Sequence, residues 1–208
     1  MTELSAVREW FRHVSRGALA LIEQVPPDAA ERPGLGNWNL AELTAHTIRA
    51  WTTLTQYLES PEPAGQAPMS AAEYLATGMT TPGIHEGVGQ RAREDAAELG
   101  GSSAAAAREA AAAALEALEE APDNRLVMSR LGPLTLREFV RTRTLELVVH
   151  GLDLARALGV EPPKEVRDAA VPAITLLAQA AAERGMATEL LEAAAGRRQL
   201  PGDYNLMR

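Results

Sequence analysis

The segment from Thr135 to Gly159 constrains the fold most strongly, because it carries a helix start signal, a helical pattern and a stop signal in turn. Thr135 is a good N-cap, and Glu138 stands at the capping-box position. Apolar residues then recur at helical spacing to about Leu158, where Gly159 is a typical C-terminal stop. We therefore expect one long helix here, around which the rest of the chain is organised.

Polar residues interrupt the apolar pattern of this helix. Glu146 and His150 are four residues apart, so they lie one above the other on one helix face, and Asp153 continues the same stripe. Leu147 and Leu154 lie beside them on the side expected to be buried. A carboxylate and an imidazole in that position must be paired, hydrogen-bonded or metal-bound, because an unpaired buried charge costs several kcal/mol.

Other segments repeat the helical pattern, with almost no strand signal. Further helices are predicted over about Glu3–Gln24, from Leu40 onward, and over Ala71–Ala76, Gly83–Leu99, Ser103–Ala121, Lys164–Arg184 and Thr188–Ala195. Asn39 and Glu42 form a capping box for the second of these helices. The pattern leaves open whether residues 83–121 form one kinked helix or two, and whether residues 124–134 form an extended connector or a small hairpin. The predicted fold class is an all-α bundle.

Composition narrows the possible functions. A chain of 208 residues fits one domain, or one domain with a terminal extension. The net charge of -8 argues against nucleic acid and anionic membranes as partners, and no apolar run approaches the length of a membrane span. Without cysteine, any thiol chemistry needs an external thiol. We expect a soluble cytoplasmic protein, because the N-terminal residues are not a signal peptide.

A third candidate donor lies on the second predicted helix. His46 shares a broad face with apolar residues such as Leu43 and Ala50, so it points inward or toward a cleft. A lone histidine there is more often an ordinary core residue. Together with Glu146 and His150, however, it would give two imidazoles and one carboxylate, a set that leaves a divalent metal open positions for catalysis.

The alternatives are less specific. The pair of Glu146 and His150 also fits a salt-bridged cluster with Arg143 or Arg141 as partner. Asp153 fits either a residue that orients a ligand histidine or an ordinary helix acid. Motifs of serine hydrolases, nucleotide-binding loops and the H-E-x-x-H metalloproteases are absent from the sequence.

Two stretches together resemble the mycothiol-dependent maleylpyruvate isomerase family. They run from Trp38 to His46 and from Thr142 to Gly159, and the resemblance covers about the first 160 residues. It implies a four-helix bundle of the wider DinB-like superfamily. It also implies that His46, Glu146 and His150 hold a divalent metal, usually zinc, and that a low-molecular-weight thiol such as mycothiol is the cosubstrate, with its sulfur activated as thiolate by the metal.

We therefore expect a DinB-like metal-binding bundle over residues 1–160, with a helical extension over residues 161–208 packed on the same domain. The predicted function is a metal-dependent, thiol-using transferase or isomerase of a small electrophile, acting as a monomer or homodimer. Asp153 and Arg143 are its candidate catalytic residues, Arg143 as a contact for an anion or a thiol carboxylate. A metal-dependent hydrolase and a non-catalytic metal- or ligand-binding module are the alternatives. The Ala-rich, Arg-over-Lys composition is typical of a high-GC actinobacterial source.

Overall fold

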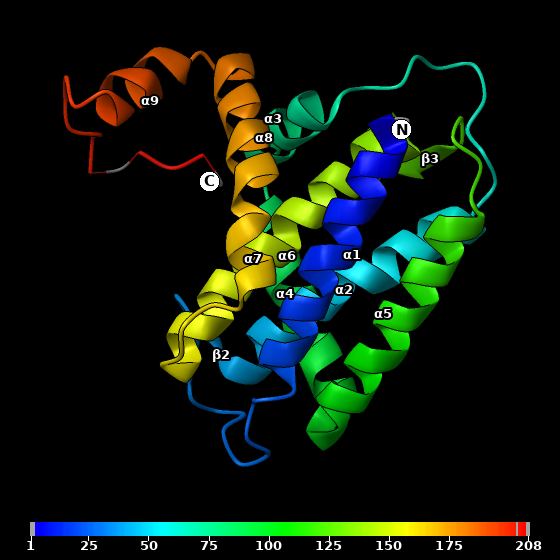
Figure 1. Cartoon of the computed structure of the whole chain (residues 1–208), viewed down its shortest axis with the longest axis vertical. Coiled ribbons are helices and arrows are strands. Elements are labelled where there is room, and N and C mark those ends of the chain that lie inside the picture. The colour runs from blue at the N-terminus through cyan, green and yellow to red at the C-terminus, as the bar shows by residue number, and fades with distance from the viewer. Residues whose placement is uncertain (1–2, 203, 207–208) are drawn as a thin grey trace.

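The chain folds around a bundle of long helices, as the sequence predicts (Figure 1). The computed structural model describes residues 3–202 and 204–206; residues 1–2 of the predicted domain, and 203 and 207–208 of the predicted extension, lie outside them. The bundle helices are α1 (Glu3–Ile22), α2 (Leu40–Glu59), α5 (Ser103–Glu120) and α6 (Leu136–Leu158). Helix α1 packs along α6 and α5, and α2 packs along α5 and α6. The all-α prediction is confirmed.

Shorter elements surround this bundle. They are α3 (Ala71–Thr80), α4 (Ile84–Leu99), a 3₁₀ turn (Gly100–Ser102), α7 (Lys164–Asp168), α8 (Ala170–Glu183) and α9 (Ala187–Ala194). Helix α4 lies against α2, whereas α8 packs on α3 and α6. Helix α9 contacts α8 and lies away from α1, α2 and α5 (Figure 1). Among the described residues, no helix combines the length and apolar character needed to cross a membrane.

Two small antiparallel ribbons join the helices. Strands β3 (Leu126–Ser129) and β4 (Gly132–Thr135) form a hairpin, one of the two forms expected for that segment. Strands β1 (Pro33–Leu35) and β2 (Trp38–Asn39) form a ribbon between the first two helices. Gly34 permits that ribbon, because a Cβ atom there would lie 2.5 Å from the Asn39 carbonyl oxygen. The β1–β2 ribbon leads directly into α2.

The predicted single helix over Lys164–Arg184 is wrong. The chain forms α7 and α8 instead, and the break falls at Ala169. Pro172 accounts for the break, since it has no N–H to donate to the carbonyl of Asp168 and is tolerated only in the first turn of a helix. The break lets α7 lie across α1, where Val166 is fully buried.

Local capping signals place the start of the main helices. In α2, the Glu42 N–H donates to Asn39 Oδ1 at 2.9 Å and the Asn39 N–H donates to Glu42 Oε2 at 3.0 Å, so the predicted capping box is confirmed.

The core between the helices is filled by large buried side chains. Among them, Trp51 of α2 donates its indole N–H to Ser15 of α1 at 2.9 Å. This bond fixes how α2 lies relative to α1.

The predicted capping box of α6 forms only by half. Thr135 Oγ1 accepts the Glu138 N–H at 3.3 Å, but the Glu138 carboxylate turns away from the cap. It accepts the backbone N–H of Ala71 at 2.8 Å and pairs with Arg141 at 2.7 Å and Arg137 at 3.0 Å. A buried donor and two guanidinium groups outcompete the local cap, so Glu138 ties the start of α3 to α6.

This contact gives a prediction about stability. Glu138→Ala should lower the free energy of unfolding by about 2 kcal/mol, because the buried Ala71 N–H and the Arg141 guanidinium both lose their acceptor. Glu109→Ala, at an exposed position of α5, is the matched control and should change it by less than about 0.5 kcal/mol. Urea unfolding measures both. Equal stabilities of the two variants would contradict the role assigned to Glu138.

Candidate metal centre

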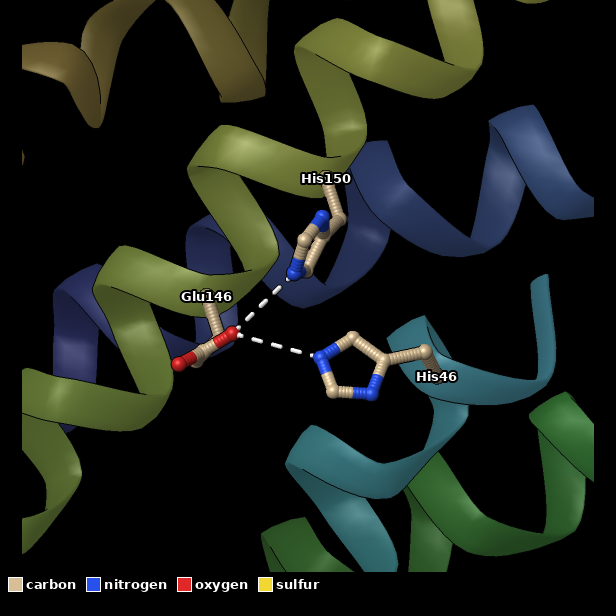
Figure 2. Close-up of side chains that lie close together, drawn as sticks. All are labelled: His46, Glu146 and His150. Carbon is tan, nitrogen blue, oxygen red and sulfur yellow. Dashed lines mark hydrogen bonds and ion pairs between the residues drawn. The ribbon is translucent and has the colours of Figure 1, made fainter. Parts of the chain in front are cut away.

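Three donor side chains converge where α2 faces α6 (Figure 2). His46 comes from α2, and Glu146 and His150 come from α6. Glu146 Oε2 lies 3.1 Å from His150 Nε2 and 3.8 Å from His46 Nε2, and the donor atoms of the three residues all lie within 4.8 Å of one another. Their side chains are 10–20% exposed. The structure thus brings together the three residues that the sequence singled out.

The local fold accounts for this convergence. Glu146 and His150 stack on one face of α6 because they are four residues apart. The cap at Asn39 fixes the register of α2, and His46 follows the cap by about two turns on the face that meets α6. Trp38, just before the cap, packs its ring edge-on against the His46 ring, with the centroids 4.8 Å apart. Trp38 lies outside α2, so the helical pattern that places His46 gives no sign of this contact.

The second ring nitrogens of the two histidines have different surroundings. His150 Nδ1 lies 3.3 Å from Asp153 Oδ2, and Asp153 Oδ1 accepts from Arg156 at 2.8 Å. His46 Nδ1 is buried and has no hydrogen-bond partner among the described residues. Both histidines therefore have Nε2 as the nitrogen that faces Glu146. Asp153 holds the His150 ring in that orientation, as a residue that orients a ligand histidine would.

The charges of the cluster depend strongly on one another. Burial lowers the pKa of His46, and the nearby His150 acts in the same direction. Burial alone would raise the pKa of Glu146, but hydrogen bonds with His150 and His46 and the charge of Arg143 hold it well below its usual value. Burial also acts to lower the pKa of His150, yet the hydrogen bonds and charges of Asp153 and Glu146 raise it to about 9. Without a metal, His150 is therefore an imidazolium held between two carboxylates.

Arg143 lies at the edge of this cluster. Its Nη2 is 3.9 Å from Glu146 Oε1, and its guanidinium carbon lies 5.1 Å from the centre of the Phe139 ring. Arg141, the other arginine considered as a partner for the Glu–His pair, bonds to Glu138 and Gln179 instead. The structure therefore places Arg143 beside Glu146 and turns Arg141 away from it.

The donor set fits a divalent metal. Tetrahedral zinc with bonds of about 2.0–2.1 Å holds its ligand atoms about 3.3 Å apart. The 3.1 Å and 3.8 Å separations from Glu146 bracket that value, so closure of His46 toward Glu146 and His150 would complete the geometry. Two imidazoles and a carboxylate suit zinc, and three protein ligands leave one position open to water or substrate.

A cavity of about 150 Å³ opens beside His46 and Glu146. Its wall carries polar residues that sequence reasoning missed: Arg49, Tyr57, Tyr74, Arg91 and Arg130. Arg49 and Tyr57 lie on α2 with His46, and Arg49 had a local signal because it follows His46 by three residues, whereas Tyr74, Arg91 and Arg130 are brought in by α3, α4 and the β3–β4 turn. A larger groove of about 480 Å³ between α3 and the end of α8 contains none of the three donors. The smaller cavity is therefore the candidate substrate site.

Comparisons with known proteins converge on one family. The sequence pattern described as mycothiol maleylpyruvate isomerase N-terminal domain matches residues 11–155, which include every candidate site residue. Among solved structures, the crystal structure of the mycothiol-dependent maleylpyruvate isomerase matches with a TM-score of 0.56 and 15% identity, covering 84% of this chain and 68% of that chain. At this identity the structural match shows the fold alone. No curated protein sequence matches the chain significantly.

The pKa values give a prediction about metal binding. At pH 7, Glu146 is ionised and His46 neutral, whereas His150 is protonated because its pKa is raised to about 9. Zinc needs the neutral imidazole, so binding at pH 7 should release about one proton. The apparent affinity should rise about tenfold per pH unit up to about pH 9 and then level off.

Calorimetry in buffers of different ionisation enthalpy measures the proton release, and chelator competition measures the affinity. His13→Asn removes a histidine that lies against Trp10 and Asp168, outside the cluster, and should leave both quantities unchanged. Zinc binding without proton release at pH 7 would contradict the prediction.

Proposed function

Because the chain belongs to the mycothiol maleylpyruvate isomerase N-terminal domain family, as its sequence predicted, we propose that it is a divalent-metal-dependent enzyme that uses a low-molecular-weight thiol. The thiol is mycothiol or a similar compound, and the reaction is the transfer or isomerisation of a small electrophile. The observation that carries this proposal is the cluster of His46, Glu146 and His150 beside a cavity. Zinc is the metal we expect from this donor set.

Each residue of the cluster has a separate role in this proposal. His46, Glu146 and His150 hold the metal, which when bound would lower the pKa of a thiol and so supply a thiolate nucleophile. Asp153 keeps His150 oriented through its Nδ1 nitrogen. Arg143 lines the cavity beside Glu146, where its fixed positive charge can contact an anionic group of the thiol or of the substrate.

The family supports a thiol as the nucleophile rather than water. The chain has no cysteine, so that thiol comes from outside the protein. A metal-dependent hydrolase would use the same donors, and it differs in needing no thiol for turnover. A non-catalytic binding module would be expected to enclose its ligand in a closed or apolar site, whereas this cavity has arginine and tyrosine side chains on its wall.

We also propose that residues 1–160 form the metal-binding domain and that residues 161–208 are a helical extension of it. The contacts of α7 and α8, two of the three helices after residue 160, support the packing of this extension on the domain. Helix α7 packs on α1 and α6, and α8 packs on α3 and α6. The extension would then help hold α6, which carries two of the three donors.

The test combines metal content with thiol-dependent turnover. We expect near-stoichiometric zinc by mass spectrometry of untagged protein dialysed without chelator, and its loss in His150→Ala. We also expect maleylpyruvate isomerisation, or conjugation of a panel of electrophiles, that requires both zinc and mycothiol. Turnover with zinc but without thiol would favour the hydrolase. Folded protein without metal would overturn the proposal.

Asp153 should act on metal affinity rather than on the reaction itself. Asp153→Asn keeps the size of the side chain but removes the charge that holds His150, so zinc affinity should fall about 10–100-fold. The pKa of His150 should also move down from about 9, so less proton is released on binding at pH 7. Turnover per bound zinc should change much less. Unchanged affinity and proton release would show that Asp153 is only an ordinary helix acid.

A further inference from the structure

Four arginines from separate parts of the chain line the same small cavity. They are Arg49 of α2, Arg91 of α4, Arg130 of the turn between β3 and β4, and Arg143 of α6. The chain as a whole has a net charge of -8, so its cations are outnumbered. Four of these cations surround a cavity of about 150 Å³, so the charge there is opposite in sign to that of the whole chain.

Two of these arginines are neutralised within the protein and two are not. Arg49 pairs with Asp95 at 2.9 Å, and Arg143 lies 3.9 Å from Glu146. Arg91 and Arg130 form no ion pair with any carboxylate in the described part of the chain. Four guanidinium groups thus face only two carboxylates, and one of these, Glu146, also pairs with His150, so positive charge is in excess at the cavity before any metal is counted.

The unpaired cations also crowd one another. Burial lowers the pKa of Arg91, and the charges of Arg130 and Arg49 lower it further, while the effect of Asp95 in the opposite direction is smaller. Like charges held this close cost free energy that a bound anion would offset. Arginine is suited to such a ligand, because its planar fork matches a carboxylate.

The rest of the wall defines the body of the ligand. Apolar side chains line it, among them Leu75, Met79 and Val88. Tyr57 and Tyr74 also line it. A cavity of about 150 Å³ is roughly the size that holds a benzene ring. The complementary ligand therefore has a small apolar body and an anionic group.

We propose that this cavity is a binding subsite for a small organic carboxylate, in which Arg91 and Arg130 bind the carboxylate and the apolar wall holds the rest of the molecule. The inference rests on the proposed function in one respect, since it assigns the carboxylate to the electrophilic substrate whose reacting atom faces Glu146 and His46. The recognition itself needs neither metal nor thiol. Arg91 and Arg130 are thus specificity residues for charge.

A matched pair of probes tests this subsite. Benzoate and benzamide have the same size and shape but differ in charge, and calorimetry measures both on the zinc-loaded and the chelator-treated full chain. We expect benzoate to bind at least about tenfold more tightly than benzamide in both forms, because arginine supplies the preference. Arg91→Gln with Arg130→Gln should reduce that ratio to below about threefold.

Arg93→Gln is the control variant. Arg93 lies two residues from Arg91 on the same helix, is exposed, and donates to Gln90 at 3.1 Å outside the cavity, so its loss should leave the ratio unchanged. Thermal unfolding confirms that each variant is folded, and the two single variants of Arg91 and Arg130 report separately. The ratio of the two affinities, for benzoate and for benzamide, in the wild-type protein tests the proposal even where a variant fails to fold.

Three results would overturn the proposal. They are an equal affinity for benzoate and benzamide, a preference that survives the double variant, or a preference that vanishes with the metal. Failure of the proposed function has a different signature, since a protein without zinc or thiol-dependent turnover would still bind benzoate through the arginines. The two hypotheses can therefore fail independently.

Discussion

The packing of α2 on α6 is the contact on which the candidate site depends, because it places His46 beside Glu146. A helix turns about 100° per residue, so a shift of one residue in α2 would carry His46 out of the cluster. Two features hold that register, namely the capping box at Asn39 and the buried hydrogen bond from Trp51 to Ser15 of α1. A conformation fixed in this way by capping and packing holds donors close together before any metal binds.

Much of the fold could be predicted because its signals are local. The cap at Asn39, the long apolar pattern of α6 and its glycine stop each act within a few residues of the element they define. One error arose where a distant group competes with a local one. Glu138 stands at the capping-box position of α6, but its carboxylate accepts a hydrogen bond from the buried N–H of Ala71 instead. The other error was local, because Pro172 is itself a signal for the break after α7.

The candidate site divides in the same way. Glu146 and His150 follow from helical spacing alone, whereas their meeting with His46 was expected only once the family resemblance joined the two stretches. Arg91 and Arg130 had no signal at all, because nothing in the sequence relates α4 or a hairpin turn to the cluster. Tertiary packing alone brings them there. Side chains that line a candidate substrate cavity can thus be invisible in a sequence whose candidate metal donors are evident.

Positive charge links the two halves of the site. In the metal-free protein the imidazolium of His150 is balanced by Glu146 and Asp153, so the cluster itself carries little net charge. A divalent metal would replace one proton and add positive charge beside a cavity that already holds the unpaired Arg91 and Arg130. An anion in the cavity would offset that charge, and the metal would in turn strengthen binding of the anion. By linkage the two binding events then favour each other to the same extent. On an acidic chain, this coupling would concentrate anionic ligands where the metal lies.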